Sequence, residues 1–86
     1  MADVSKRLRR RVEQDFGDTA PDACDLLARS SDSERVQAAI VFAAARDSDE
    51  LRRQAELAQV DWRDVLVNGQ IADAGWEQRL RTGLGR

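Results

Sequence analysis

The stretch Val-Gln-Ala-Ala-Ile-Val-Phe-Ala-Ala-Ala at positions 36–45 decides how this chain folds. Only its glutamine is polar, so a helix formed here is apolar on nearly every side. A helix without a polar face belongs in the middle of a fold, surrounded by other elements. We therefore predict a central helix over residues 33–46. Its most deeply buried line should hold Val36, Ile40 and Ala43.

Capping signals divide the rest of the chain into short helices. The segment Ser31-Asp32-Ser33-Glu34 matches a capping box, in which the serine oxygen and the glutamate satisfy free backbone amides. Acids at 47–50 end the central helix and begin the next one, and Thr19, Asp61 and Asp73 are predicted caps for three others. The predicted helices span residues 4–16, 20–30, 33–46, 49–60, 62–67 and 74–82, with 83–86 as a frayed tail.

The composition also favours helices. Ala, Leu, Arg, Gln and Glu are abundant, β-branched residues are sparse and Tyr is absent, so a packed sheet is disfavoured. The 86 residues suffice for one domain, 1–86, with one core. We expect an all-α, compact single-domain bundle of five or six short helices. Its segment 33–60 should resemble a HEAT-type helical hairpin, although one hairpin does not make an array.

The missing residue types exclude several kinds of site. The chain has no His and a single Cys, so it lacks the ligands of a zinc tetrahedron and any histidine base. A calcium loop starting at Asp47 fails, because its sixth and twelfth positions hold Arg52 and Ala58. We expect no cofactor, no metal and no enzymatic activity. An enzyme would have to rely on carboxylates such as those of Asp61, Asp64 and Asp73.

Charge is unevenly distributed. The formal net charge is −2, yet the segment Lys-Arg-Leu-Arg-Arg-Arg at 6–11 holds five cations. Arg7, Arg10 and Arg11 of this segment are candidate partner-binding residues. The cations could contact an acidic protein, contact phosphates, or solvate one face of a helix. No aromatic residue interleaves them, so base stacking on single strands is disfavoured.

Two tryptophans are the other candidate contacts. Trp62 and its neighbour Arg63 belong to types enriched at binding hot spots, and Trp76 shares a helical stripe with Leu80. The periodicity predicts that both tryptophans pack in the core, since Trp62 shares a face with Val65. A role as an interface anchor is the alternative for Trp62, Arg63 and Trp76.

A resemblance rests on two segments. The sequence Glu-Arg-Val-Gln-Ala-Ala-Ile at 34–40 and the sequence Ala-Gln-Val-Asp-Trp-Arg-Asp-Val-Leu-Val at 58–67 resemble a group of short all-helical bacterial proteins, common in actinobacteria. The likeness spans about residues 31–80. It implies a bacterial cytoplasmic protein and carries no activity, cofactor or partner.

These observations predict a non-enzymatic protein–protein interaction module or small accessory protein. Its partner would be another protein or a second copy, because the stripe Val4, Leu8, Val12 and Phe16 could pair with itself in a homodimer. The alternative is a nucleic-acid-associated protein that uses the Arg-rich first helix. The longest apolar run, residues 38–45, is too short to cross a bilayer, and the single cysteine is consistent with the cytoplasm.

Overall fold

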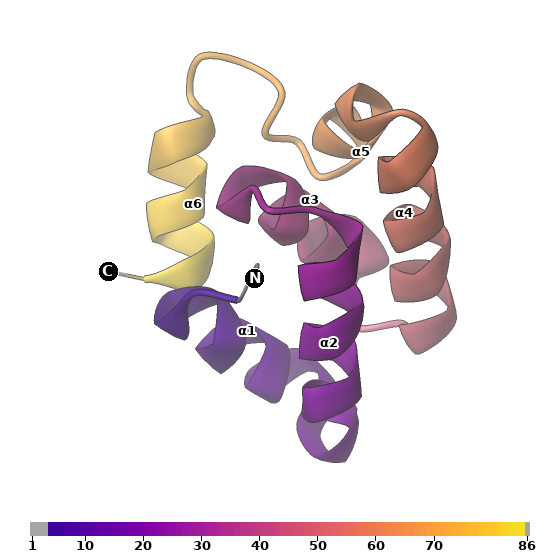
Figure 1. Cartoon of the computed structure of the whole chain (residues 1–86). Helices are drawn as coiled ribbons and strands as arrows, with labels where there is room; N and C mark the ends of the chain where they lie inside the picture. The colour runs from indigo at the N-terminus through magenta and orange to yellow at the C-terminus, as the bar shows by residue number, and fades with distance from the viewer. Residues whose placement is uncertain (1–3, 86) are drawn as a thin grey trace.

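The computed structural model describes residues 4–85, and this part of the chain is helical without strands (Figure 1). The prediction of an all-α fold is confirmed. The elements in chain order are α1 (Lys6–Phe16), the 3₁₀ turn η1 (Gly17–Thr19), α2 (Ala20–Ser30), α3 (Glu34–Ala44), α4 (Ser48–Val60), α5 (Trp62–Asn68) and α6 (Trp76–Leu84).

Helix α3 occupies the centre of the fold, as the apolar stretch predicts (Figure 1). It packs against α1, α2, α4 and α5. Ala38, Ala39, Ile40 and Val41 are fully buried on successive sides of the helix. Ala43, predicted to lie on the deepest line, is only half-buried. The small alanine side chains let the neighbouring helices approach closely, so the core lies all around α3 rather than along one face.

The predicted ends of the central helix need correction. Helix α3 stops at Ala44 instead of residue 46, because Ala45 and Arg46 adopt left-handed conformations with φ of 49° and 70°. Its N-cap is Ser33, whose Oγ accepts a hydrogen bond from the Val36 amide at 3.4 Å. The predicted capping box does not form, because the Glu34 carboxylate binds Arg7 of α1 instead of a backbone amide of its own helix.

Other predicted helix boundaries shift by one or two residues. Helix α1 begins at Lys6 with Ser5 as its cap, α4 begins at Ser48, and α5 extends to Asn68. Asp47 and Asp61 cap α4 and α5 as predicted. Thr19 occupies the N-cap position of α2 as predicted, but its side chain makes no capping hydrogen bond, because its hydroxyl donates to the Phe16 carbonyl instead.

The C-terminal helix differs most from the prediction. Helix α6 covers Trp76–Leu84 rather than 74–82, and its N-cap is Gly75 instead of Asp73. Gly83 and Leu84 belong to the helix and not to a frayed tail, because Leu84 is buried and Arg11 donates to the Gly83 carbonyl at 2.9 Å. Residue 86 lies outside the described residues.

The stripe proposed for self-association is part of the core. Val4, Leu8 and Val12 are buried, and Phe16 packs partly buried against them. This stripe is therefore not available for pairing with a second copy. Helices α3 and α4 do pack against each other, while their likeness to a HEAT hairpin stays a prediction. None of the helices formed by residues 4–85 has the length and apolar character needed to cross a membrane.

The contact between Gly69 and α3 offers a test of this packing. A Cβ atom built on Gly69 would lie 2.7 Å from the Cα and carbonyl oxygen of Ala39. We expect Gly69→Ala to lower the free energy of unfolding by about 1–3 kcal/mol, because backbone would have to move to relieve the clash. Urea denaturation followed by circular dichroism measures this change.

Gly75→Ala is the matched control. The nearest atom to its added Cβ is an Asp73 oxygen at 3.4 Å, an ordinary van der Waals distance. We expect this variant to lose less than about 1 kcal/mol, because its only cost is that alanine is a poorer N-cap of α6 than glycine. Equal stabilities for the two variants would contradict the close approach of α5 to α3.

Candidate interaction surfaces

A hollow in the surface lies between α1 and α2. These helices diverge from the turn η1 like the arms of a V (Figure 1). The groove between them has a volume of about 1110 Å³. Its buried lining residues are the small side chains Ala20 and Cys24, with half-buried Ala28 one turn further along α2. Because these three residues are spaced by four, they lie on one side of α2, and their short side chains make the groove deep at its floor.

The walls of this groove are charged. Arg9 and Glu13 line it from α1, and Asp25 and Arg29 line it from α2. All four residues are exposed. The groove thus combines a small apolar floor with both signs of charge at its rim, which is the general anatomy of a protein contact surface.

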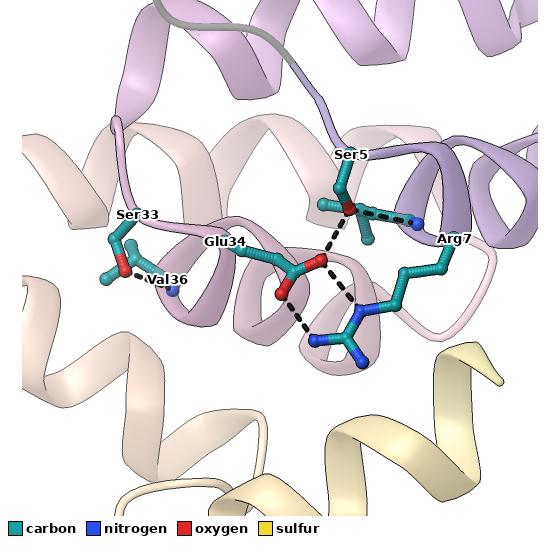
Figure 2. Close-up of polar contacts among 6 residues, drawn as sticks. Ser5, Arg7, Ser33, Glu34 and Val36 are labelled. Carbon is teal, nitrogen blue, oxygen red and sulfur yellow. Dashed lines mark hydrogen bonds and ion pairs between the residues drawn. The ribbon is translucent and has the colours of Figure 1, made fainter. Parts of the chain in front are cut away.

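Arg7, one of the candidate partner-binding residues, belongs to an intramolecular clamp (Figure 2). Its Nε and Nη2 donate to the two Glu34 carboxylate oxygens at 2.8 and 2.5 Å. The Ser5 hydroxyl donates to the same carboxylate at 2.5 Å and accepts from the Leu8 amide. The clamp therefore joins the N-terminal ends of α1 and α3.

The clamp holds Glu34 in its charged form. The hydrogen bond from Arg7 is the main cause of a lowered pKa for Glu34, and the Ser5 hydroxyl adds to it, against partial desolvation. The pKa of Arg7 is raised in turn by Glu34. A carboxylate with a lowered pKa is a poor general base, so Glu34 is badly suited to activate the neighbouring Ser5 hydroxyl as a nucleophile. The geometry indicates a structural role.

Arg11 also makes contacts inside the fold. Its Nε donates to the Asp15 carboxylate at 3.0 Å, its Nη1 donates to the Gly83 carbonyl, and its guanidinium lies over the Phe42 ring. The Asp15 side chain is only 1% exposed and also pairs with Arg46 at 3.6 Å. Arg10 is exposed. Two of the three candidate arginines, Arg7 and Arg11, are thus engaged by other residues of the fold.

Trp62 lies on the surface, contrary to the prediction that it packs in the core. Its exposed fraction is 48%, and the Arg63 guanidinium lies 5.4 Å from its ring centre. Val65 and Leu66 are buried one turn later, so α5 turns its apolar side inward only after its first residue. The Trp62–Arg63 pair therefore remains a candidate anchor, as the alternative interpretation had it.

Trp76 packs half-buried against the core, which agrees with its predicted role. The Arg35 guanidinium stacks on its ring at 4.4 Å and donates two hydrogen bonds to the Ile71 carbonyl, at 3.1 and 2.9 Å. Ile71 is fully buried and anchors the loop before α6. Arg35 thus fixes both this loop and the start of α6 on α3.

The acids considered for catalysis lie apart from this groove. Asp61 and Asp64 stand exposed at the start of α5, and Asp73 stands exposed before α6. None of the three lines the groove between α1 and α2. Over residues 4–85, no three side chains of His, Cys, Asp or Glu are grouped closely enough to hold a metal ion.

Three polar residues of α3 have roles that sequence reasoning missed. Gln37 is 1% exposed, and its Nε2 donates to the Ser31 and Leu27 carbonyls at the end of α2. Glu34 and Arg35 reach out to α1 and to the loop before α6. A lone glutamine inside an apolar helix was the available signal, because a buried amide needs partners. The partners of Glu34 and Arg35 are 27 and 36 residues away, so local patterns carried no sign of them.

The clamp makes stability depend on pH. Because the pKa of Glu34 is lowered on folding, its contribution is complete above the ordinary value of 4.5 and is lost as the pH falls through the lower, folded value. We expect Glu34→Gln to cost about 1 kcal/mol at pH 7, since the charged pair is partly exposed. The difference from the wild type should shrink below pH 4.5. Denaturant titrations across this range measure it.

Glu56→Gln, at an exposed position of α4, is the control for the loss of one carboxylate. It should lower the stability at pH 7 by less than about 0.5 kcal/mol. Parallel pH profiles for the wild type and Glu34→Gln would rule out the clamp as a source of stability.

The two tryptophans should differ in their effect on stability. We expect Trp76→Ala to cost about 2–4 kcal/mol, because it removes core contacts and the stacking partner of Arg35. Trp62→Ala should cost less than about 1 kcal/mol, as expected for an exposed side chain. Thermal unfolding of both variants gives the comparison, and a larger loss for Trp62→Ala would refute this placement.

Known proteins give no functional guide to this chain. Comparisons with protein-family models, with curated proteins and with solved structures find no match. The resemblance to short bacterial helical proteins therefore stays a prediction.

Proposed function

We propose that this chain is a non-enzymatic protein-interaction module whose contact surface is the groove between α1 and α2. The observation that carries the proposal is the combination of groove size and lining: about 1110 Å³, with small side chains at the floor and charges at the rim. A low floor admits a helix backbone at close range. We expect the groove to take one face of an α-helix, whose diameter is about 10 Å.

The chemistry of the groove defines the kind of partner. Ala20, Cys24 and Ala28 offer an apolar strip that favours a partner surface with protruding aliphatic side chains. Charges of both signs at the rim favour a partner with charges of both signs beside those side chains. A folded helical protein meets both conditions better than a nucleic acid, whose backbone presents negative charge alone.

The placement of the basic residues lends less support to nucleic-acid binding. Arg7 and Arg11 are engaged by carboxylates of the same chain, so a phosphate would have to compete with Glu34 and Asp15. We further propose a bacterial cytoplasmic protein, on the resemblance of segments 34–40 and 58–67. The exposed Trp62–Arg63 pair would extend the contact as a second anchor.

A groove-filling variant tests the proposal. Ala28→Met adds a flexible side chain to the groove while keeping a good helix former in α2. Tagged wild type and Ala28→Met are compared by quantitative affinity capture from a lysate of the source cells. We expect the groove variant to lose at least about 90% of a binding protein that the wild type retains, equivalent to more than about 1.4 kcal/mol.

Gln78→Met, at an exposed position of α6, is the matched control. It should retain the binding protein at the wild-type level, and circular dichroism must show that both variants are folded. A binding protein retained equally by all three forms would exclude this groove as the contact surface, and so would the absence of any specifically retained protein.

A further inference from the structure

We infer that the groove between α1 and α2 binds a helix of a partner protein in one direction, with a basic first half near η1 and an acidic second half at the open end. This inference rests on the proposed function, because it names the chemistry of the partner at the same surface. The order of charges along the groove carries it, which is an observation separate from the size and the floor of the groove.

The half of the groove near η1 is acidic. Glu13 lines the groove from α1, one turn before Gly17, and Asp18 lines it within η1 itself. Asp25 lies about midway along the part of α2 that lines the groove. All three acidic residues are exposed. The negative charge of the groove therefore lies between η1 and the middle of the groove.

The open end of the groove is basic. Arg9 lines it from α1, about two turns before Gly17. Arg29 lines it from α2, next to the last residue of that helix. Both arginines are exposed, and they lie on the parts of α1 and α2 that diverge from η1 (Figure 1). Charge along the groove thus changes from negative near η1 to positive at the open end.

A partner helix matches this order with basic side chains near η1 and acidic side chains at the open end. Opposite charges then face each other along both rims, whereas a helix of uniform charge is repelled by one half of the groove. Between its charged flanks the helix needs aliphatic side chains, spaced by three and four residues, to fill the space above the small floor residues. Residues 20–29 of α2 span about 14 Å, so the contact covers about three turns of the partner helix.

The dipole of the partner helix decides its direction. A helix carries partial positive charge at its N-terminus and partial negative charge at its C-terminus. With its N-terminus over Glu13 and Asp18 and its C-terminus at the end lined by Arg9 and Arg29, both partial charges are favourably placed. The reverse direction puts partial charges beside full charges of the same sign. The bound helix therefore runs in the direction of α2 and opposite to α1.

This chemistry sets the partner apart from an ordinary surface helix. A helix on its own favours acids in its first turn and bases in its last turn. The groove demands the reverse order, so the partner helix gains from the groove the electrostatic stabilisation that it lacks by itself. The inference thus predicts a preference that the intrinsic stability of the ligand helix cannot produce.

Two synthetic peptides of equal composition test this preference. Each has about 12 residues, blocked ends, a leucine ridge and a cross-link on the opposite face that keeps it helical. The first carries lysines in its first half and glutamates in its second half, and the other carries the same charges exchanged. Amide shifts of the ¹⁵N-labelled whole chain should map to α1 and α2. We expect a dissociation constant of about 0.1–1 mM for the first peptide and a value at least about threefold weaker for the other.

A nitroxide amino acid at the last position of the first peptide measures the orientation. It should broaden the amide signals of Arg9 and Arg29 more than that of Asp18. Because the nitroxide belongs to the peptide, the measurement needs no chemistry at Cys24 and uses the wild-type chain.

A double variant tests the role of the basic end. Arg9→Glu with Arg29→Glu makes the charged rim acidic along its whole length and should weaken the first peptide at least about tenfold. Arg52→Glu with Arg81→Glu, at exposed positions of α4 and α6, is the matched control. It changes the net charge equally and should leave the affinity within about twofold, because the peptide itself is neutral. Circular dichroism confirms that both variants are folded.

Three outcomes would overturn the inference: equal affinity for the two peptides, strongest broadening at Asp18, or no shifts in the groove at about 5 mM of the first peptide. Each of them is distinct from a failure of the proposed function. If the lysate partner is still lost in Ala28→Met, the groove binds a protein of another kind. Where the inference holds, Ala28→Met should weaken the first peptide at least about tenfold, and Gln78→Met should leave it unchanged.

Discussion

The burial of α3 on all of its sides is the constraint on which the rest of the structure depends. A helix with no polar face has to be covered all around, and the four helices that pack on it provide that cover. The neighbouring helices can pack closely on α3 because alanines supply much of its surface. At Ala39 the backbone of Gly69 approaches so closely that only a glycine fits there. The order of the short helices follows from this requirement.

Charged side chains connect what apolar packing does not reach. Arg7 links α1 to the start of α3, Arg35 links α3 to the loop before α6, and Arg11 links α1 to α6. Each of them meets a carboxylate or a backbone carbonyl, so the groups at helix ends are satisfied by distant residues. The arginines of the first helix therefore serve stability to a large extent. Arg7 and Arg11 are therefore less available for contacts with a binding partner.

The groove between α1 and α2 is a consequence of the same arrangement. Both helices turn their apolar sides toward the interior, and the short turn η1 makes them diverge, which leaves a hollow on their outer side. Small residues keep it open, and exposed acids and bases line its walls. A surface with size, an apolar floor and charges of both signs is a better basis for binding a protein than a row of cations alone.

The sequence by itself determined the helical class, the central position of 36–45 and the caps Asp47 and Asp61, because these depend on residues close together in the chain. Only the tertiary structure decided that Glu34 binds Arg7 instead of capping its own helix, that Trp62 faces water, and that Leu84 is held in α6. It also decided that residues on α1 and α2 form one groove. Such outcomes depend on contacts between residues far apart in sequence, and neither periodicity nor capping patterns contain information about which distant segment will lie alongside.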